Sequence, residues 1–434
     1  MAYIIGHPIK YAADFYGRSQ EIARFFEIIG GTQAQSVSVL GVRRAGKTSF
    51  LQHVAQAEIQ RNYLRHPDKV TMIYLDISTC KTPSEFYYRL LQRLRHALGN
   101  IDTAVLWQQS APEATNMYDV EAFLCQFPEQ RIILLLDEFD HIRHDTFTPE
   151  FLTELRAMAV VMEYDLAYVT ASHRDLFYLG SHVGLPPTSP FYNIFYPSPI
   201  YLAGLDTAVL PDLIRQPAQS EGVTFVDEIV AQIIACAGSL PFFIQATAAQ
   251  FLADAKSNKT RSISKTSWQL ASDLSPYFEQ WWRYFAPLDR DLLHAVVCST
   301  PMDNLTYPPH QIQETRRVLQ SYGLLCEVDG EWQVNGRIFA NWIQQYATLV
   351  EQKIELMERN RETAVAPPNL RQILTQSFNL DELRALCFDL KVDFESLPGD
   401  GKAAKAQSLI EHFQNRRRLH VLVTAVRQER GAVI

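Results

Sequence analysis

The first half of the chain alternates short apolar runs with longer amphipathic segments. Five runs have the length of strands, at positions 37–40, 70–77, 131–136, 166–170 and 200–202. The segments between them repeat apolar residues at helical spacing, as 84–98 does with Phe86, Leu90, Leu91 and Leu94. Strand and helix in alternation indicate a parallel sheet covered on both faces, so residues 1–205 are expected to form one α/β domain.

After Leu205 the pattern becomes helical, and 206–275 is expected to form a helical lid. Residues 276–350 predict helices at 287–298 and 310–322, a hairpin around Asp329-Gly330 and a helix from Arg337, which is the order of a winged-helix domain. Residues 351–368 are rich in charge and end in Pro367-Pro368, the composition of a linker. Residues 369–434 predict a small all-α domain whose apolar core comprises Leu370, Leu374, Leu383, Leu386, Leu390, Phe394, Leu409 and Phe413.

Composition narrows the class of protein. Apolar residues make up 47% of the 434 and charged residues 20%, which is ordinary for a globular chain. No apolar run approaches the roughly 18 residues of a membrane helix, no leader pattern opens the sequence, and the six cysteines are widely spaced. We therefore expect a cytoplasmic protein with reduced thiols and no membrane partner. The net charge of −8 argues against a protein that coats nucleic acid or anionic lipid.

The clearest chemical signal is a phosphate-binding loop at 41–48. Its sequence, GVRRAGKT, matches GxxxxGK[ST] and lies between a predicted strand and a predicted helix, as the motif requires. Gly41 and Gly46 let the backbone wrap a phosphate, Lys47 reaches the β- and γ-phosphates, and the Thr48 hydroxyl ligates magnesium. The cofactors predicted are ATP and Mg²⁺, and the further nucleotide-binding residues of this segment are Arg44, Ala45 and Ser49.

Two carboxylates end the buried strand at 131–136. Asp137 is expected to hold the magnesium shell and Glu138 to orient the attacking water. The alternative is that Asp137 only caps the next helix. The next predicted strand, 166–170, leads to Ser172 and Arg174, which are our first and second candidates for a sensor of the γ-phosphate. The alternative is that this segment is a turn at the end of the strand without a sensor role. Arg156 is a candidate arginine finger, which would act on the nucleotide of a neighbouring subunit. The commoner outcome is an arginine that is simply solvated on the helix surface.

The ordered set of motifs resembles STAND and related archaeal-type AAA+ P-loop ATPases over residues 1–350. The segments that carry the resemblance are FYGR at 15–18 followed by Glu21, GVRRAGKTSFL at 41–51, LLLDEFD at 134–140, SPFYNIF at 189–195, LAGL at 202–205 and GSLP at 238–241. The resemblance implies that the strand before the phosphate loop (Walker A) and the strand before Asp137 (Walker B) are separated in the sheet by the sensor strand, which precedes Ser172. It also implies that Gly17 and Arg18 lie near the adenine and that Pro241 packs on the nucleotide, although Ser239 and Leu240 depart from the usual Gly-His-Pro spelling.

The last 66 residues carry a second resemblance, to bacterial effector-associated, death-like domains, through 379–390, 392–394 and 397–402. It implies contacts with an effector protein that carries a matching domain, in prokaryotic antiphage or conflict signalling. The segment has 10 basic and 8 acidic residues, a charge of +2 against −10 for the rest. Two oppositely charged patches are predicted, the acidic one with Asp381, Glu382 and Asp389 and the basic one with Arg416, Arg417 and Arg418.

Other patterns are weaker. His141 and His144 could face one metal ion, but such pairs are usually solvated. GDGK at 399–402 is no second phosphate loop, because no strand precedes it and Ala403 replaces Ser or Thr. Residues 276–350 hold 5 basic and 8 acidic residues, which favours a structural arm over DNA binding.

Two functional hypotheses result from the sequence. The first is a STAND-like ATPase switch that forms a homo-oligomer on ATP binding and recruits an effector. The second is a nucleic-acid-associated AAA+ ATPase of origin-recognition type, whose winged helix binds DNA.

Overall fold

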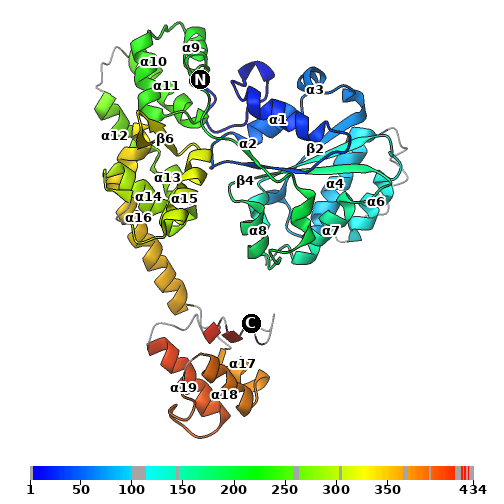
Figure 1. Ribbon diagram of the computed structural model, residues 1–434, viewed down its shortest axis with the longest axis vertical. Helices are drawn as coiled ribbons and strands as arrows, with labels where there is room; N and C mark the ends of the chain where they lie inside the picture. The colour runs from blue at the N-terminus through cyan, green and yellow to red at the C-terminus, as the bar shows by residue number, and fades with distance from the viewer. Residues whose placement is uncertain are drawn as a thin grey trace. The chain divides into compact units, whose positions relative to one another are not determined.

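The computed structural model describes residues 3–99, 114–142, 146–257, 263–302, 305–364, 370–390 and 392–415, with positions 422, 423, 425, 426 and 429. The chain folds into two compact units, Met1–Gln345 and Tyr346–Ile434 (Figure 1). In the described part of the chain no helix is long and apolar enough to cross a membrane.

A parallel sheet forms the centre of the first unit. In the described residues its strands are β1 (Val37–Leu40), β2 (Val70–Asp76), β3 (Arg131–Asp137), β4 (Asp165–Ser172) and β5 (Ile200–Tyr201). Their order is β2-β3-β4-β1-β5, and every neighbouring pair is parallel. The five predicted strands are confirmed, and β4 lies between β1 and β3 as the resemblance implies. Leu40 pairs with Ser172 and Asp76 with Asp137, so the polar strand ends meet at one edge.

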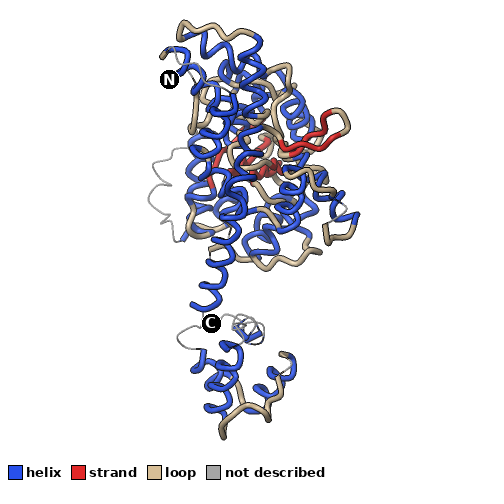
Figure 2. The backbone as a smooth tube through the Cα atoms, turned by 90° about the vertical axis from the view of Figure 1, so that its left-hand side faces the viewer, coloured by secondary structure: helices blue, strands red, loops and turns tan. Residues whose placement is uncertain are grey.

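Helices cover both faces of this sheet, as Figures 1 and 2 show. Ile132, Leu134 and Leu136 of β3 belong to one core cluster, together with side chains of the helices that follow β2 and β3. Ile133 and Leu135 are also fully buried and, by the alternation of a strand, point to the other face. The helices of this part are α1 (Ser19–Ile29), α2 (Lys47–Val54), α3 (Ala57–Tyr63), α4 (Pro83–Leu98), α6 (Met117–Leu124), α7 (Pro149–Ala159) and α8 (Leu176–His182).

Helices take over after β5, as the sequence predicts. They are α9 (Leu210–Ser220), α10 (Asp227–Ala237), α11 (Pro241–Lys256), α12 (Ile263–Asp273), α13 (Ser275–Tyr284), α14 (Pro287–Val297) and α15 (Pro309–Ser321). An antiparallel hairpin of β6 (Leu325–Val328) and β7 (Glu331–Val334) follows, and α16 (Arg337–Ala364) comes next. Asp329 and Gly330 both have positive φ, 53° and 82°, which is the turn that two-residue hairpins favour. Positions 351–364 of the predicted linker are helical.

The second unit is helical in its described residues, with α17 (Leu370–Ser377), α18 (Leu380–Asp389) and α19 (Lys402–Asn415). Asn379 and Glu382 form a reciprocal capping box at the start of α18. All eight apolar residues predicted for its core join one cluster, seven of them buried and Leu390 packed against it. The basic patch predicted at 416–418 lies outside the described residues.

Candidate functional site

The phosphate loop connects β1 to α2 and depends on its two glycines. A Cβ on Gly41 would come within 3.1 Å of the Leu202 carbonyl oxygen, so a larger residue would require the neighbouring backbone to shift. Gly46 has φ of 96°, a left-handed conformation that favours glycine, and no atom beyond its neighbours in the chain is found within 4 Å of the position of its missing Cβ. The loop therefore turns sharply and leaves open space in front of the first residues of α2.

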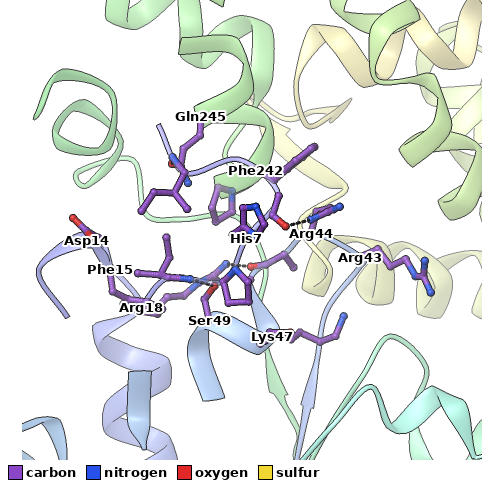
Figure 3. A pocket seen from close by; sticks show the side chains of 18 of the residues that line it. His7, Asp14, Phe15, Arg18, Arg43, Arg44, Lys47, Ser49, Phe242 and Gln245 are labelled. Atoms are coloured by element: carbon purple, nitrogen blue, oxygen red, sulfur yellow. Dashed lines mark hydrogen bonds between the residues drawn. The ribbon is translucent and has the colours of Figure 1, made fainter. Parts of the chain in front are cut away.

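A cavity of about 560 Å³ lies in front of this loop (Figure 3). Its size is within the range of small-molecule sites. Nine of the predicted site residues line it, namely Arg18, Arg44, Ala45, Gly46, Lys47, Thr48, Ser49, Glu138 and Pro241. Gly17 and Asp137 are direct sequence neighbours of lining residues, and Gly41 lies two positions before the lining residue Arg43, but none of the three is part of the lining. Pro241 is the first residue of α11, where its fixed φ suits a helix start.

Lys47 is buried behind the loop. Its Nζ donates hydrogen bonds to the carbonyl oxygens of Gly41 at 2.8 Å and Val42 at 3.3 Å. Burial lowers the pKa of its ammonium, and the nearby carboxylates of Asp140 and Glu138 partly offset this effect. The lysine is thus held between the loop and the acidic end of β3.

Asp137 and Glu138 end β3 in different environments. The Asp137 side chain is 1% exposed; its Oδ2 accepts from the Tyr74 hydroxyl at 2.8 Å and its Oδ1 from the Glu138 amide at 2.9 Å. Glu138 has φ of 51°, which is uncommon for a residue with a side chain, and it lines the cavity. Such strain persists where surrounding structure enforces it and is concentrated at functional sites.

Asp140 ties the end of β3 to the segment after β4. Its Oδ2 lies 2.6 Å from His173 Nδ1 and accepts from the His173 amide at 2.9 Å, while its Oδ1 accepts from the Arg174 amide at 3.2 Å. Burial alone would raise the pKa of the Asp140 carboxyl, but the hydrogen bond and charge of His173, with the charge of Lys47, hold it below its usual value. This carboxylate fixes the backbone next to the candidate sensor residues.

The structure does not bring Ser172 and Arg174 to the large cavity. The Ser172 side chain is buried, and its Oγ donates to the Arg174 carbonyl at 2.7 Å. The Arg174 guanidinium lies 4.8 Å above the Tyr178 ring, and Arg174 lines a second cavity of about 40 Å³. Their sensor role stays a prediction, as does the finger role of Arg156, which is half-buried on α7.

Arg18 connects three segments around the cavity. Its Nη1 donates to Glu21 Oε1 at 2.9 Å, and its Nη2 donates to the carbonyl oxygens of Ala45 and Ala203. Burial lowers the pKa of its guanidinium. With these donors engaged by the protein, Arg18 holds the entrance to α1 against the phosphate loop.

Sequence analysis missed the N-terminal segment that lines the cavity. The amide of Ile4 donates to Gln245 Oε1 at 2.9 Å, and the amide of Ile9 donates to Ser49 Oγ at 3.1 Å. Gly6, His7 and Pro8 also line the cavity; this segment has neither a motif nor a periodic pattern that could have revealed it. Asp76 was missed as well, although an acidic residue at the end of a predicted strand was a usable signal.

A metal site made by histidines receives no support from the described residues, which contain no cluster of three His, Cys, Asp or Glu side chains suited to a metal ion. His141 lies beside Glu138, with Nδ1 3.7 Å from Oε2. His144 lies outside the described residues.

Comparison with known proteins identifies both units. The family model for novel STAND NTPase 2 matches residues 24–263, and that for effector-associated domain 7 matches residues 370–431. No curated protein sequence matches the chain. Among solved structures, a Walker-type ATPase of Pyrococcus abyssi aligns with a TM-score of 0.52 and 13% identity, over 79% of this chain and 100% of that one. The ORC2 protein of Aeropyrum pernix, in ADPNP–ADP complexes, aligns with a TM-score of 0.47 and 11% identity, over 81% and 97%.

The first of these structures shares the fold of this chain. The first family match covers more than half of the sequence and contains the phosphate loop and both carboxylates that end β3. The chain therefore belongs to the novel STAND NTPase 2 family, as a P-loop NTPase of STAND type with an effector-associated domain in its second unit.

Proposed function

We propose that this protein is an ATP-dependent switch. It binds Mg-ATP in the 560 Å³ cavity, hydrolyses it, self-associates in the ATP-bound state and recruits an effector through residues 369–434. The observation that carries the proposal is the joint presence of the phosphate loop, Lys47 and Glu138 on one cavity. A buried lysine, an open glycine loop and a strained carboxylate at the same edge of one parallel sheet suit phosphoryl transfer to water.

The phosphates are bound by the loop and by Lys47. The amides of residues 44–48 and the start of α2 supply partial positive charge toward an anion. Lys47 exchanges its bonds to the Gly41 and Val42 carbonyls for the β- and γ-phosphates. On the other side of the cavity, Pro241 and the segment that includes Gly17 and Arg18 contact the adenine end.

Magnesium fits the donors near Thr48 and Asp137. A hydroxyl and a carboxylate offer the oxygen ligands that this ion prefers, and the Asp137 carboxylate is buried and oriented by Tyr74. When bound, the ion neutralises negative charge on the phosphate oxygens. Glu138 accepts a hydrogen bond from the attacking water and turns its lone pair toward the γ-phosphate.

The effector-associated domain supports the second half of the proposal. The effector carries a matching domain, and the acidic face with Asp381 and Glu382 is our candidate contact surface. Arg156 is our candidate for the residue that reaches the nucleotide of a neighbouring subunit. We place the system in prokaryotic antiphage or conflict signalling.

Phosphate release from Mg-ATP tests the catalytic proposal. The wild-type chain should hydrolyse ATP; Lys47→Ala should lose both binding and turnover, and Glu138→Gln should keep binding and lose turnover by about 100-fold or more. Lys69→Ala is the matched control, because this lysine is solvent-exposed and pairs with the surface residue Glu129. Its substitution should leave binding and turnover unchanged. Equal turnover in wild type and Lys47→Ala would remove the assignment of the phosphate loop.

A further inference from the structure

One face of α13 contacts the phosphate loop. Four residues at i, i+3, i+4 and i+7 form this face, namely Tyr277, Gln280, Trp281 and Tyr284. Gln280 Oε1 accepts from Arg43 Nη1 at 3.1 Å, and Trp281 Nε1 donates to the Arg43 carbonyl at 3.1 Å. The Arg43 guanidinium also lies 5.9 Å from the centre of the Tyr284 ring. The helix and the loop are 237 positions apart in sequence, so the tertiary fold alone creates this contact.

The two arginines of the loop have different surroundings. The Arg44 guanidinium lies 5.1 Å from the ring centres of both Phe242 and Tyr277. Arg43 instead lies near enough to Lys47 for its charge to lower the pKa of the lysine ammonium. In Figure 3 the side chains of Arg43 and Lys47 extend from the loop in the same direction, whereas Arg44 lies beside Phe242. Arg43 is thus the additional cation on the lysine side of the loop.

Arg43 is only partly satisfied in this position. Its Nε is buried and has no hydrogen-bond partner within the protein, although Nη1 is bound to Gln280. It lines the large cavity and also the 40 Å³ cavity that Trp281 and Tyr284 border. A guanidinium with an unused buried donor gains when it meets an acceptor with several oxygens, and a phosphate is the best match to its fork of donors.

We propose that Arg43 is a specificity-determining residue for the γ-phosphate and that α13 competes with the nucleotide for it. With a triphosphate in the cavity, the Arg43 side chain leaves Gln280 and Tyr284 and binds γ-phosphate oxygens; with a diphosphate it stays on α13. A bond from the guanidinium to a charged phosphate oxygen is stronger than its bond to a neutral amide oxygen, so the triphosphate wins this competition. This inference rests on the proposed function, because it requires nucleotide in the cavity.

The competition affects a helix that is also packed against α16. The Phe278 and Phe339 rings stack with centres 5.0 Å apart, the Trp282 and Trp342 rings are 5.6 Å apart, and Trp342 Nε1 donates to Ser275 Oγ at 2.8 Å. Release of Arg43 therefore removes contacts from one face of α13 while its other face stays on α16. The γ-phosphate thereby changes the contacts of a helix outside the α/β domain.

Binding of ADP and of a non-hydrolysable ATP analogue to the full chain, both with Mg²⁺, tests the inference. The measured quantity is the ratio of the two dissociation constants. Arg43→Ala should lower the preference for the triphosphate by about tenfold, the loss expected for one charge-assisted hydrogen bond. Gln280→Ala should raise that preference, because α13 then competes less well for Arg43. Shifts of the ratio in opposite directions in these two variants are expected only if α13 and the γ-phosphate compete for Arg43.

Two controls keep the result interpretable. Arg24→Ala should leave the ratio unchanged, since its guanidinium lies over the Tyr196 ring and Arg24 does not line the nucleotide cavity. Arg43→Gln tests the same loss of charge with a side chain closer in size, in case the alanine variant unfolds. If Arg43 and Gln280 variants shift the ratio in the same direction, or neither shifts it, Arg43 merely holds α13 and the inference is wrong. If the wild type binds neither nucleotide, the proposed function fails and this inference with it.

Discussion

The two units of this chain bury different kinds of side chain. In the first unit, charged groups such as Lys47 and Asp137 lie in the interior, each with protein partners. Among the described residues of the second unit, every side chain in the buried class is apolar or a cysteine. Burying a charge costs free energy unless it is paired. The first unit therefore has charged groups in its interior that can act on a ligand, whereas the second can bind partners only through its outer surface.

The largest effect should come from breaking a buried charge pair in the first unit. Asp140→Asn leaves His173 and the Arg174 amide without their full acceptor, and we expect a loss of about 3 kcal/mol in the free energy of unfolding at neutral pH. Urea denaturation followed by circular dichroism measures this loss. Asp381→Asn in the second unit is the control, because this carboxylate is 90% exposed and its removal should cost little. Similar losses in both variants would contradict the comparison.

The same pair predicts a dependence on pH. The folded-state pKa of Asp140 is below its usual value, so its contribution to stability is present above the unfolded-state pKa of about 3.9 and is lost as pH falls through the folded-state pKa. The difference in unfolding free energy between wild type and Asp140→Asn should therefore shrink as pH falls below about 4. A difference that stays constant down to strongly acidic pH would exclude the carboxylate as its source.

A substitution that creates a cavity in the core of the second unit should destabilise that unit alone. Leu374 is fully buried in the core of α17–α19, and Leu374→Ala should destabilise this unit by about 2 kcal/mol, the lower end of the range for such a truncation. ATP turnover should be unchanged, since no described core residue of this unit is part of the phosphate site. Hydrogen exchange of the second unit and phosphate release, measured on the same preparation, test both statements. A matching loss of turnover would show that the two units depend on each other.

Removal of residues 369–434 should have little effect on catalysis. The shortened chain retains the phosphate loop and every residue that lines the 560 Å³ cavity, so its turnover should stay within about twofold of the full chain. Association with the effector should disappear. If the shortened chain cannot fold, the second unit is needed for the ATPase core and the proposal of a separate recruiting domain is wrong.

The smallest effect is expected in binding to duplex DNA. Residues 276–350 have a net charge of −3, so duplex DNA should bind no better than a weak nonspecific ligand, with dissociation constants of about 10⁻⁴ to 10⁻⁶ M at physiological salt. Fluorescence anisotropy at several salt concentrations measures this binding. A nanomolar, sequence-dependent complex would favour the alternative of an origin-recognition-type ATPase.

Local patterns predicted most of the fold and the centre of the site. Apolar runs fixed the five strands, and the phosphate-loop motif between β1 and α2 needed only its neighbours in sequence. Contacts between distant segments were beyond such reasoning. The bonds of Ile4 to Gln245 and of Arg43 to Gln280 join positions 241 and 237 apart. The hydrogen bond from the Ser172 hydroxyl to the Arg174 carbonyl, within the turn after β4, was not predicted either.

Ligand-induced stabilisation tests the central claim, that the phosphate loop of the first unit binds Mg-ATP, most directly. With free Mg-ATP at about one hundred times its dissociation constant, binding to the folded state alone should add about 2.7 kcal/mol to the free energy of unfolding of the full chain. The account predicts a clear rise in the unfolding temperature of the wild type and none for Lys47→Ala at the same ligand concentration. An equal rise in both proteins would contradict it, because the ligand would then bind independently of the phosphate loop.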